Sequence, residues 1–259
     1  MESVRAGKVL SSYKDDIDIC FTSHLLRSKN TAQIISNIMK QQRRKKYTML
    51  EDYRLAERHY GALQGFVKTD VENGFYGHSK EDVILWRRSW NVTPPLLNND
   101  DPRRIREIQR YGSICGGEDN IPRGESLQMV ANNRVKPFVG DVLTPCLQSL
   151  CFPYQKKVTA MIVGHANSLR ALIGVLCKVE DDEKKIELLE QLRIQTCQPL
   201  VLQFKLTIDG SVNVCSIPEA LPESIPIAPL DQCNRLMKEE RYQVTSPLEL
   251  RSFNRTLIL

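Results

Sequence analysis

His165 occupies a position where α/β proteins commonly bind phosphate. The stretch VTAMIVGHANSLRALIGVL, at 158–176, is apolar as far as His165, turns polar there, and then carries the spacing of an amphipathic helix. At such a junction the first N–H groups of the helix and its dipole attract an anion. We therefore interpret His165 as a candidate phosphate-binding residue, with Asn167, Ser168 and Arg170 beside it.

Arg27 follows a second apolar stretch in the same way. The sequence IDICFTS, at 17–23, leads directly into helical spacing, and Arg27 falls near its start. Ligands of open α/β sheets bind at the carboxyl ends of the strands. We therefore expect Arg27 and His165 to converge on one phosphate pocket. The alternative is a histidine satisfied by a local hydrogen bond and an arginine in solvent.

Two other stretches bring charged side chains that could act on the same anion. RLAERHYGALQGF places four polar residues in a row: Glu57, Arg58, His59 and Tyr60. LWRRSW supplies the adjacent pair Arg87 and Arg88. Neighbouring arginines on a helix point in different directions. Both arginines could contact an anion, but because they point in different directions, one of them usually lies in solvent.

A strand, a polar junction and a helix occur in this order twice, at 17–41 and at 158–176. This repetition predicts an α/β fold with a mainly parallel central sheet flanked by helices. Further helices are expected at 79–90, 125–151 and 181–194, and paired strands at 199–206 and 211–217 joined by a turn at 207–211. A long flexible loop is expected at 98–120, and an irregular tail at 218–259.

The composition favours one globular domain over residues 1–259, with 41% hydrophobic and 26% charged residues. The net charge of +5 suits an anionic substrate but is too small to indicate nucleic acid. The basic run KQQRRKKY, at 40–47, is better explained as cations at a helix C-terminus.

The cysteines and the apolar runs point to a cytoplasmic protein. The eight cysteines are scattered without a CxxC pair, which favours reduced, mostly buried thiols and disfavours a zinc site. No signal peptide follows Met1, and no apolar stretch approaches the length that spans a membrane. We therefore expect no metal, no membrane partner and no nucleic-acid partner.

Five motifs, in this order, resemble the cofactor-dependent phosphoglycerate mutases of the histidine phosphatase superfamily. They are ICFTSHLLRSKNTA, LAERHYGALQGFVK, ILWRRSW, PRGESL and IVGHANSLRALIG, within a similarity that spans Ile17 to Phe204. ERHYGALQG together with WRRS is more specific to the mutases than the superfamily motif alone. The resemblance implies an isomerase of glycolysis that interconverts 3-phosphoglycerate and 2-phosphoglycerate through a phosphohistidine. 2,3-Bisphosphoglycerate would be the priming phosphoryl donor, and no metal would be needed.

Carried over position by position, the resemblance also implies the roles of individual residues. Arg27 and His165 would bind and stabilise the phosphoryl group in transfer. Glu57 would be the general acid and base toward the substrate hydroxyl. Asn167 would donate a hydrogen bond in the same pocket. The substrate carboxylate and distal phosphate would be held by Arg58, Tyr60, Lys68, Arg87 and Arg88.

The chain departs from the family at its beginning. The nucleophile of the family is the histidine of an Arg-His-Gly motif after the first strand, and this motif does not occur here. The sequence matches the family from midway along its first helix, so we expect a truncated, N-terminally incomplete domain whose first strand is missing. We expect its strands at 17–23 and 158–164 to face a gap, and the chain to fold poorly and turn over little. Ala166 and Cys197 replace glycines of the family near the pocket.

His24, His59 and His78 do not fill the missing role in this interpretation. His24 is expected to be a surface or capping histidine, His59 to be structural, and His78 to lie in a loop.

Other functions stay open at this point. A histidine-type phosphatase or a bisphosphoglycerate synthase would share the same pocket and differ in the rate with each substrate. A non-catalytic relative would bind a phosphometabolite or a protein partner without phosphoryl transfer. The family commonly assembles, so a homodimer or homotetramer is possible, and the sequence assigns no role to 98–120 or to the tail.

Overall fold

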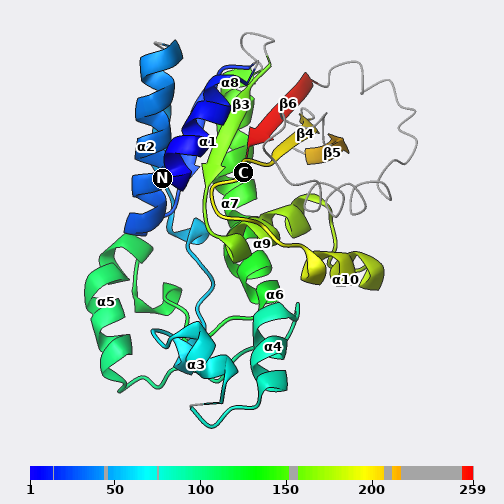
Figure 1. The fold of residues 1–259 in the computed structure, drawn as a ribbon. Helices are drawn as coiled ribbons and strands as arrows, with labels where there is room; N and C mark the ends of the chain where they lie inside the picture. Colours follow the sequence, from blue (N-terminus) through cyan, green and yellow to red (C-terminus); the bar gives the residue numbers. More distant parts are fainter. Residues whose placement is uncertain are drawn as a thin grey trace.

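A six-stranded mixed sheet in the order β2-β1-β3-β6-β4-β5 forms the centre of the fold (Figure 1). The computed structural model describes residues 1–13, 15–43, 46–74, 76–151, 157–206, 212–216 and 253–258. The strands are β1 Ile19–Thr22, β2 Thr48–Glu51, β3 Thr159–Val163, β4 Val201–Leu206, β5 Val212–Ser216 and β6 Phe253–Ile258.

β1 and β3, the strands that precede Arg27 and His165, lie at the centre of the parallel part of the sheet. β1 pairs in parallel with β2 on one side and with β3 on the other, with Cys20 opposite Met49 and Met161. Every residue of β1 is buried, which explains why a parallel strand covered on both faces reads as a continuous apolar run. The α/β class predicted from the repeated strand–helix pattern is thereby confirmed.

The expected gap between the strands at 17–23 and 158–164 is wrong, because β1 and β3 pair directly with each other. The other edge of β3 is covered by β6, which runs parallel to β3 and antiparallel to β4. The tail expected at 218–259 is therefore not irregular throughout, since it supplies β6 at Phe253–Ile258. The rest of that tail, and the expected turn at 207–211, lie outside the described residues.

Two helices pack on one face of the sheet. They are α1 Glu2–Ser11 and α2 Leu26–Arg43. Their buried side chains Leu10, Ile35 and Met39 form one cluster with Met161 and Ile258 of the sheet. The absence of a side chain at position 7 allows the close approach of α1 and α2, since a Cβ there would come within 2.9 Å of the Ile38 side chain.

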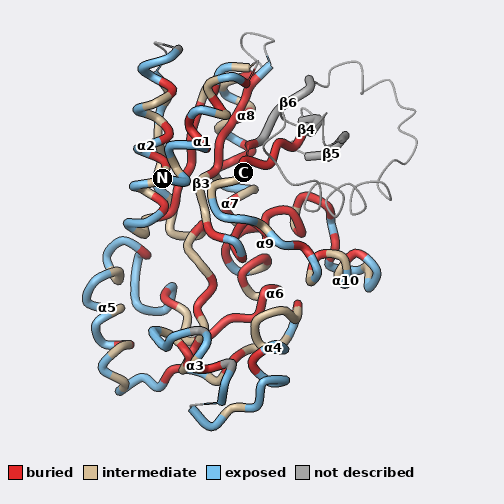
Figure 2. The backbone as a smooth tube through the Cα atoms, viewed as in Figure 1, coloured by how far each residue is buried: buried red, intermediate tan, exposed pale blue. Residues whose placement is uncertain are grey.

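The opposite face is covered by a long helical run and one further helix, against which a second helix packs. The neighbours of Cys20 and Met161 along their strands, Phe21 and Ile162, point to this face, as the alternation of a strand requires. The run consists of α6 Leu127–Met129, the π-helix Val130–Val135, α7 Lys136–Phe138, the π-helix Val139–Leu143 and α8 Thr144–Cys151. The other two are α9 Ala166–Leu176 and α10 Glu183–Gln191. Figure 2 shows the buried residues concentrated along β3 and α9.

Three helices group beyond the sheet, at the bottom of Figure 1. They are α3 Lys68–Glu72, α4 Lys80–Arg88 and α5 Pro102–Cys115, accompanied by short 3-10 turns at Tyr53–Leu55, Gly61–Leu63 and Glu118–Asn120. Ser79 caps α4, the helix expected at 79–90, and its hydroxyl accepts from the Asp82 N–H.

The expectation of a flexible loop at 98–120 is wrong, because α5 occupies most of it. Asp101 caps the helix by accepting from the Arg103 N–H, and Pro102 fills the first turn. Gly116 ends it with a φ of 77°, a left-handed conformation that glycine adopts without steric cost.

Candidate functional site

The parallel pairing of β1 and β3 brings Ser23 and His165 together. Thr22 lies opposite Val163 in the register, so the chain leaves both strands at the same edge of the sheet. The Ser23 Oγ lies 2.9 Å from His165 Nε2. His165 is the N-cap of α9, and its own N–H donates to the Ser168 Oγ at 3.0 Å. The expected junction of strand, histidine and helix is therefore present.

Arg27 reaches the same histidine from the start of α2. Its Nε donates to His165 Nδ1 at 3.1 Å, so the convergence of these two side chains predicted from the sequence is found in the structure. Because Nδ1 accepts from Arg27, the ring proton of a neutral His165 lies on Nε2 and is donated to Ser23. Among the described residues, no group bonds the two Nη nitrogens of Arg27.

His165 is neutral at neutral pH. Its side chain is only 7% exposed, and burial, together with the charge of Arg27, lowers the pKa of the imidazole to about 3.

Glu57 is held near this pair by Asn167, the second residue of α9. The Asn167 amide donates to Glu57 Oε1 at 3.1 Å and to the Tyr60 hydroxyl at 2.8 Å. The Arg58 backbone N–H donates to the same Glu57 oxygen at 2.8 Å. Glu57 Oε2 accepts no bond from a described residue, which leaves that oxygen available to a ligand.

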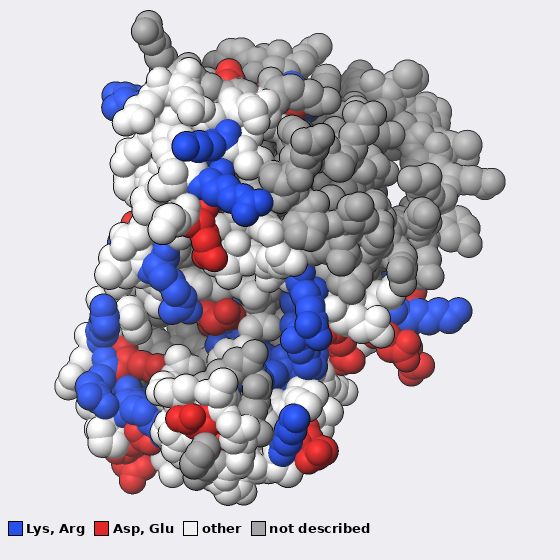
Figure 3. Space-filling model, in the orientation of Figure 1, with Lys and Arg blue, Asp and Glu red and all other residues white. Residues whose placement is uncertain are grey.

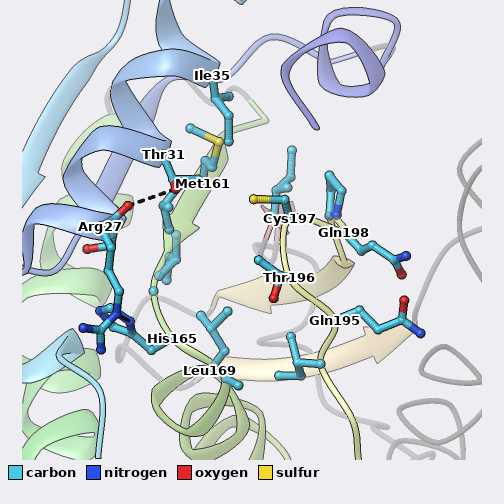
Figure 4. Close-up of a pocket in the computed structure, with 18 of the residues that line it drawn as sticks. Arg27, Thr31, Ile35, Met161, His165, Leu169, Gln195, Thr196, Cys197 and Gln198 are labelled. Atoms are coloured by element: carbon cyan, nitrogen blue, oxygen red, sulfur yellow. Dashed lines mark hydrogen bonds between the residues drawn. The ribbon is translucent and has the colours of Figure 1, made fainter. Parts of the chain in front are cut away.

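Arg27, Glu57 and His165 line one cavity of about 350 Å³. In Figure 4, Arg27 and His165 lie together at one side of it, and Thr196 and Cys197 face them from the segment before β4. Ile258 of β6 also lines this cavity.

Cys197 adopts a strained backbone in the wall of this cavity. Its φ is +54°, in the left-handed region that residues with a Cβ rarely occupy. The glycine that the family places here would carry no such strain. Ala166, the other departure from a glycine, begins α9 and lines the same cavity.

Arg58 is buried beside Tyr60 and lacks part of its expected bonding. It is 1% exposed, and its guanidinium lies 4.7 Å from the centre of the Tyr60 ring. Its Nη2 donates to the Arg87 carbonyl at 3.0 Å, whereas its Nε and Nη1 are buried without a partner among the described residues. Buried donors are normally satisfied, so these two nitrogens suggest an anion-binding role.

Two of the remaining predicted residues, Arg87 and Arg88, lie near this group. The Arg87 guanidinium stacks 5.3 Å from the Tyr60 ring centre, and the Arg88 carbonyl accepts from Arg170 at 3.4 Å. Lys68 begins α3, but its side chain lies outside the described part of the structure. Neither Arg87 nor Arg88 lines the cavity described above.

Arg170 is a site residue to which the sequence analysis assigned no role. It is 4% exposed, and its Nη1 lies 3.4 Å from the Asn167 side-chain oxygen. Burial, followed by the charges of Arg58 and Arg88, lowers its pKa to about 10. The only sequence signal was its position five residues after His165, on the first turns of α9.

A buried ion pair fixes the backbone around Glu57. Arg134 donates to Glu125 through Nε and Nη2, both at 2.8 Å, and the two residues are 6% and 3% exposed. Arg134 also donates to the carbonyls of Ala56 at 3.0 Å and Glu57 at 3.4 Å. Glu125 accepts from the His59 N–H at 2.9 Å. The sequence signalled Glu125 only through the motif PRGESL, and nothing singled out Arg134.

Gly61 is required by the turn that follows these residues. Its φ is +60°, and a Cβ at this position would collide with the carbonyl oxygen of Pro95. The glycine of ERHYG therefore allows the segment that carries Glu57 to pass close against residues 94–95.

The other three histidines are occupied differently. His59 accepts from the Gly61 N–H at Nδ1 and lies 3.0 Å from Glu107 at Nε2, which agrees with a structural role. His78 packs edge-on against Trp86. His24 is not a surface or capping residue, because it is half-buried, packs against Tyr111 and lines a second cavity.

Neither a metal group nor a membrane span is found in the described ranges. No three His, Cys, Asp or Glu residues come together there in a way that could hold a metal ion. No helix within those ranges is both long and apolar enough to cross a bilayer.

Comparisons with known proteins agree with the motifs. A family model described as "Histidine phosphatase superfamily (branch 1)" matches residues 2–96. A 2,3-bisphosphoglycerate-dependent phosphoglycerate mutase of Buchnera aphidicola subsp. Schizaphis graminum (strain Sg) is 36% identical over 203 residues, which cover 78% of this chain and 79% of the relative. The protein of the same name from Haemophilus influenzae (strain PittEE) is 34% identical and covers 78% of this chain and 80% of the relative.

A solved structure shares the fold at lower identity. The mycobacterial glucosyl-3-phosphoglycerate phosphatase in complex with VO3 matches with a TM-score of 0.53 and 18% identity, over 83% of this chain and 80% of that one.

Proposed function

Because this chain belongs to the family of 2,3-bisphosphoglycerate-dependent phosphoglycerate mutases, in the histidine phosphatase superfamily, we propose that its 259 residues bind phosphoglycerates in the cavity lined by Arg27, Glu57 and His165. The family consists of enzymes that act on phosphoglycerates in glycolysis. The observation that carries the proposal is the contact of Arg27 with His165, beside a Glu57 carboxylate held by Asn167.

Arg27 supplies the positive charge for the phosphoryl group. Its Nε is used on His165, and its two Nη nitrogens are left to bind equatorial phosphoryl oxygens. Phosphoryl transfer depends mainly on positioning and on stabilising charge on these oxygens. Arginine provides that charge, so the proposal requires no metal.

Glu57 acts on the substrate hydroxyl in this proposal. Its Oε1 accepts from Arg58 and Asn167, which fixes the carboxylate and directs Oε2 to the ligand. A carboxylate fixed in this way can take up and return the hydroxyl proton. Arg58 has two buried nitrogens without a partner among the described residues, and it binds the substrate carboxylate or distal phosphate beside Tyr60 and Arg87. Lys68 and Arg88 are proposed to help hold the same groups.

The residues around the cavity can bind 2,3-bisphosphoglycerate, but they offer no suitable side chain to accept a phosphoryl group from it. When bound, this compound would supply the phosphoryl group for priming. The printed sequence has no Arg-His-Gly histidine to accept it. His165 has both ring nitrogens engaged, by Arg27 and by Ser23. We therefore propose that these 259 residues bind phosphoglycerates in the cytoplasm with little or no mutase turnover.

The test is binding and turnover measured on the same 259-residue protein. Titration calorimetry should detect 3-phosphoglycerate and 2,3-bisphosphoglycerate, and Arg27→Ala should weaken both at least tenfold. Lys184→Ala, which removes an exposed cation from α10, is the control and should change neither. Equal affinity for wild type and Arg27→Ala would remove the proposed pocket.

Turnover is followed with a coupled mutase assay and with labelled 2,3-bisphosphoglycerate. Little activity and no stoichiometric phosphoenzyme are expected. Rapid turnover with an acid-labile phosphate on a histidine would overturn the proposed lack of activity, while leaving the proposed binding site in place.

A further inference from the structure

A chain of hydrogen bonds runs from Arg27 through His165 into the interior of the protein. The Arg27 Nε donates to His165 Nδ1 at 3.1 Å, and His165 Nε2 lies 2.9 Å from the Ser23 Oγ. The Ser23 Oγ in turn lies 2.6 Å from the Ser28 Oγ, which donates to the Leu25 carbonyl at 3.0 Å. Ser23 directly follows β1 and Ser28 lies in the first turn of α2, so the chain is built on the same strand–helix junction as Arg27.

Both serines are enclosed by protein. Ser23 is 0% exposed and Ser28 is 3% exposed. Ser28 borders the cavity of Arg27 and His165, whereas Ser23 is not part of its lining. The Ser23 Oγ also accepts from the Leu25 N–H at 3.2 Å. Ser23 therefore has no direct access to a ligand in this cavity, and its effect on binding passes through His165.

The hydrogen bonds of this chain can be ordered in two directions, and Arg27 selects one of them. A neutral imidazole has one N–H and one acceptor nitrogen, whereas a guanidinium only donates. With the ring proton on Nε2, His165 donates to Ser23. Ser23 then donates to Ser28, and Ser28 to the Leu25 carbonyl, so every donor of the chain has an acceptor. In the reverse order, the proton on Nδ1 would face the Arg27 Nε–H, and the 3.1 Å contact would join two donors.

His165 contributes a lone pair to the site and not a charge. Burial and the charge of Arg27 lower its pKa to about 3, which keeps the ring neutral. In Figure 3 the molecule is hollowed between the sheet and the lower helices, with Lys and Arg side chains along the borders of the hollow. Cations other than His165 therefore supply the positive charge on this face, and the Nδ1 lone pair is left to hold Arg27.

We propose that Ser23 and Ser28 are positioning residues for phosphate binding, because they keep the acceptor lone pair of His165 on Nδ1, where it fixes Arg27. The inference rests on the proposed function, in which the Nη nitrogens of Arg27 bind the phosphoryl oxygens. Arg27 is exposed, and a long exposed side chain loses conformational entropy when it is held in one position. The bond to Nδ1 holds the guanidinium before a ligand arrives, which lowers the entropy lost on binding.

The same order of bonds argues against Ser23 as a nucleophile. A serine nucleophile needs a neighbouring base that takes its proton. Here Nε2 carries the ring proton as long as Nδ1 accepts from Arg27, so the bond between His165 and Ser23 runs in the opposite direction.

The first test identifies the protonated ring nitrogen of His165 by nitrogen NMR, at neutral pH, on the 259-residue protein labelled at its histidines. The signals are assigned by their loss in His165→Gln. Wild type should show a protonated Nε2 and an unprotonated Nδ1. Ser23→Ala removes the acceptor of the Nε2 proton, and Ser28→Ala removes the acceptor of the Ser23 hydroxyl, so each should give a mixture of the two tautomers. Ser28→Thr keeps a hydroxyl, its methyl can enter the cavity that Ser28 borders, and it should retain the wild-type tautomer.

The second test measures the Kd of inorganic phosphate and of 3-phosphoglycerate by titration calorimetry on the same variants. Ser23→Ala and Ser28→Ala should raise both about threefold to tenfold, which is the effect of losing one hydrogen bond. Ser28→Thr should stay within twofold of wild type. The matched control is Ser126→Ala, which removes a buried hydroxyl that caps α6 and lines neither this cavity nor that of His24. It should lower the Tm without changing the tautomer of His165 or either Kd.

The outcomes separate this inference from the proposed function. A proton on Nδ1 in wild type would overturn the inference, and so would a Ser28→Ala variant that behaves like Ser126→Ala in both tests. A raised Kd with an unchanged tautomer would also overturn it, because Ser28 would then act on the ligand without His165. If Arg27→Ala weakens both probes and the serine variants do not, the positioning role is wrong and the proposed function stands. If wild type binds neither probe, both are wrong. Should Ser23→Ala fail to fold, the comparison of Ser28→Ala with Ser28→Thr decides.

Discussion

Replacing Glu125 by alanine should destabilise this protein far more than an average surface substitution. Glu125 is 3% exposed and accepts two bonds from Arg134 and one from the His59 N–H. Its removal leaves Arg134, at 6% exposure, as a buried charge without its carboxylate. Breaking one side of a buried ion pair costs about 3–5 kcal/mol.

This loss is large compared with the stability of a typical domain, about 5–15 kcal/mol. A chain of this size loses about 2–4 °C of Tm per kcal/mol, so the Tm should fall by roughly 6–20 °C. Calorimetry gives the Tm, and urea unfolding followed by tryptophan fluorescence gives the free energy. Glu125→Gln keeps an oxygen for the His59 N–H and should lie between wild type and Glu125→Ala.

The control is Glu180→Ala, which breaks an exposed ion pair. Glu180 lies 3.3 Å from the Lys136 ammonium, and the two side chains are 42% and 63% exposed. An exposed pair contributes about 0–1 kcal/mol. If Glu125→Ala cost no more than Glu180→Ala, the reasoning that the buried pair fixes the backbone around Glu57 would be refuted.

Three further substitutions or conditions test other features. Cys197→Gly should raise the free energy of unfolding by about 1 kcal/mol, because glycine adopts a φ of +54° without strain. Cys197→Ala keeps the strain and should not raise it. A melting curve unchanged by Cys197→Gly would contradict this prediction. Ile258→Ala should lower the free energy of unfolding, measured with urea, by about 2–5 kcal/mol, because Ile258 is only 1% exposed. The control Ile114→Ala, at a residue that is 53% exposed, should lower it little. Equal losses would argue against a buried β6. The free energy of unfolding should fall as the pH drops from 6.5 toward 3. The pKa of His165 is about 3 in the folded protein and 6.5 in the unfolded chain, so in this range only the unfolded chain takes up the proton. His165→Gln should flatten the dependence of this free energy on pH, and an unchanged dependence would contradict the low pKa of His165.

The strands and helices around the site could be predicted because their signals are local. β1 and β3 read as buried apolar runs, and the helical spacing begins immediately after each. Parallel strands place their carboxyl ends at one edge, so the convergence of Arg27 and His165 followed from these two patterns alone.

Helix α5 was missed although its boundary signals are present. Asp101, Pro102 and Gly116 are residues that begin and end helices. The many charged residues between them, and the neighbouring Asn and Gly residues, suggested a loop instead. The helix buries Arg104 and Cys115, whereas two of its isoleucines, Ile105 and Ile114, are exposed.

The position of β6 and the pairing of Glu125 with Arg134 depend on tertiary structure. β6 contacts β3 and β4, and β3 lies far from it along the chain. Arg134 reaches the carbonyls of residues 56 and 57 across a similarly long stretch of sequence. A single sequence contains no local pattern for such contacts, so neither could be predicted from it.

The placement of β6 sets the order in which the sheet can be assembled. β6 lies between β3 and β4, yet it follows both of them along the chain. During synthesis, β3 and β4 therefore emerge before the strand that joins them, and each has an unpaired edge until residues 253–258 are made. Contacts between distant segments form slowly, and unpaired strand edges are sites of aggregation. The yield of folded protein should therefore depend on how quickly this last pairing forms after synthesis.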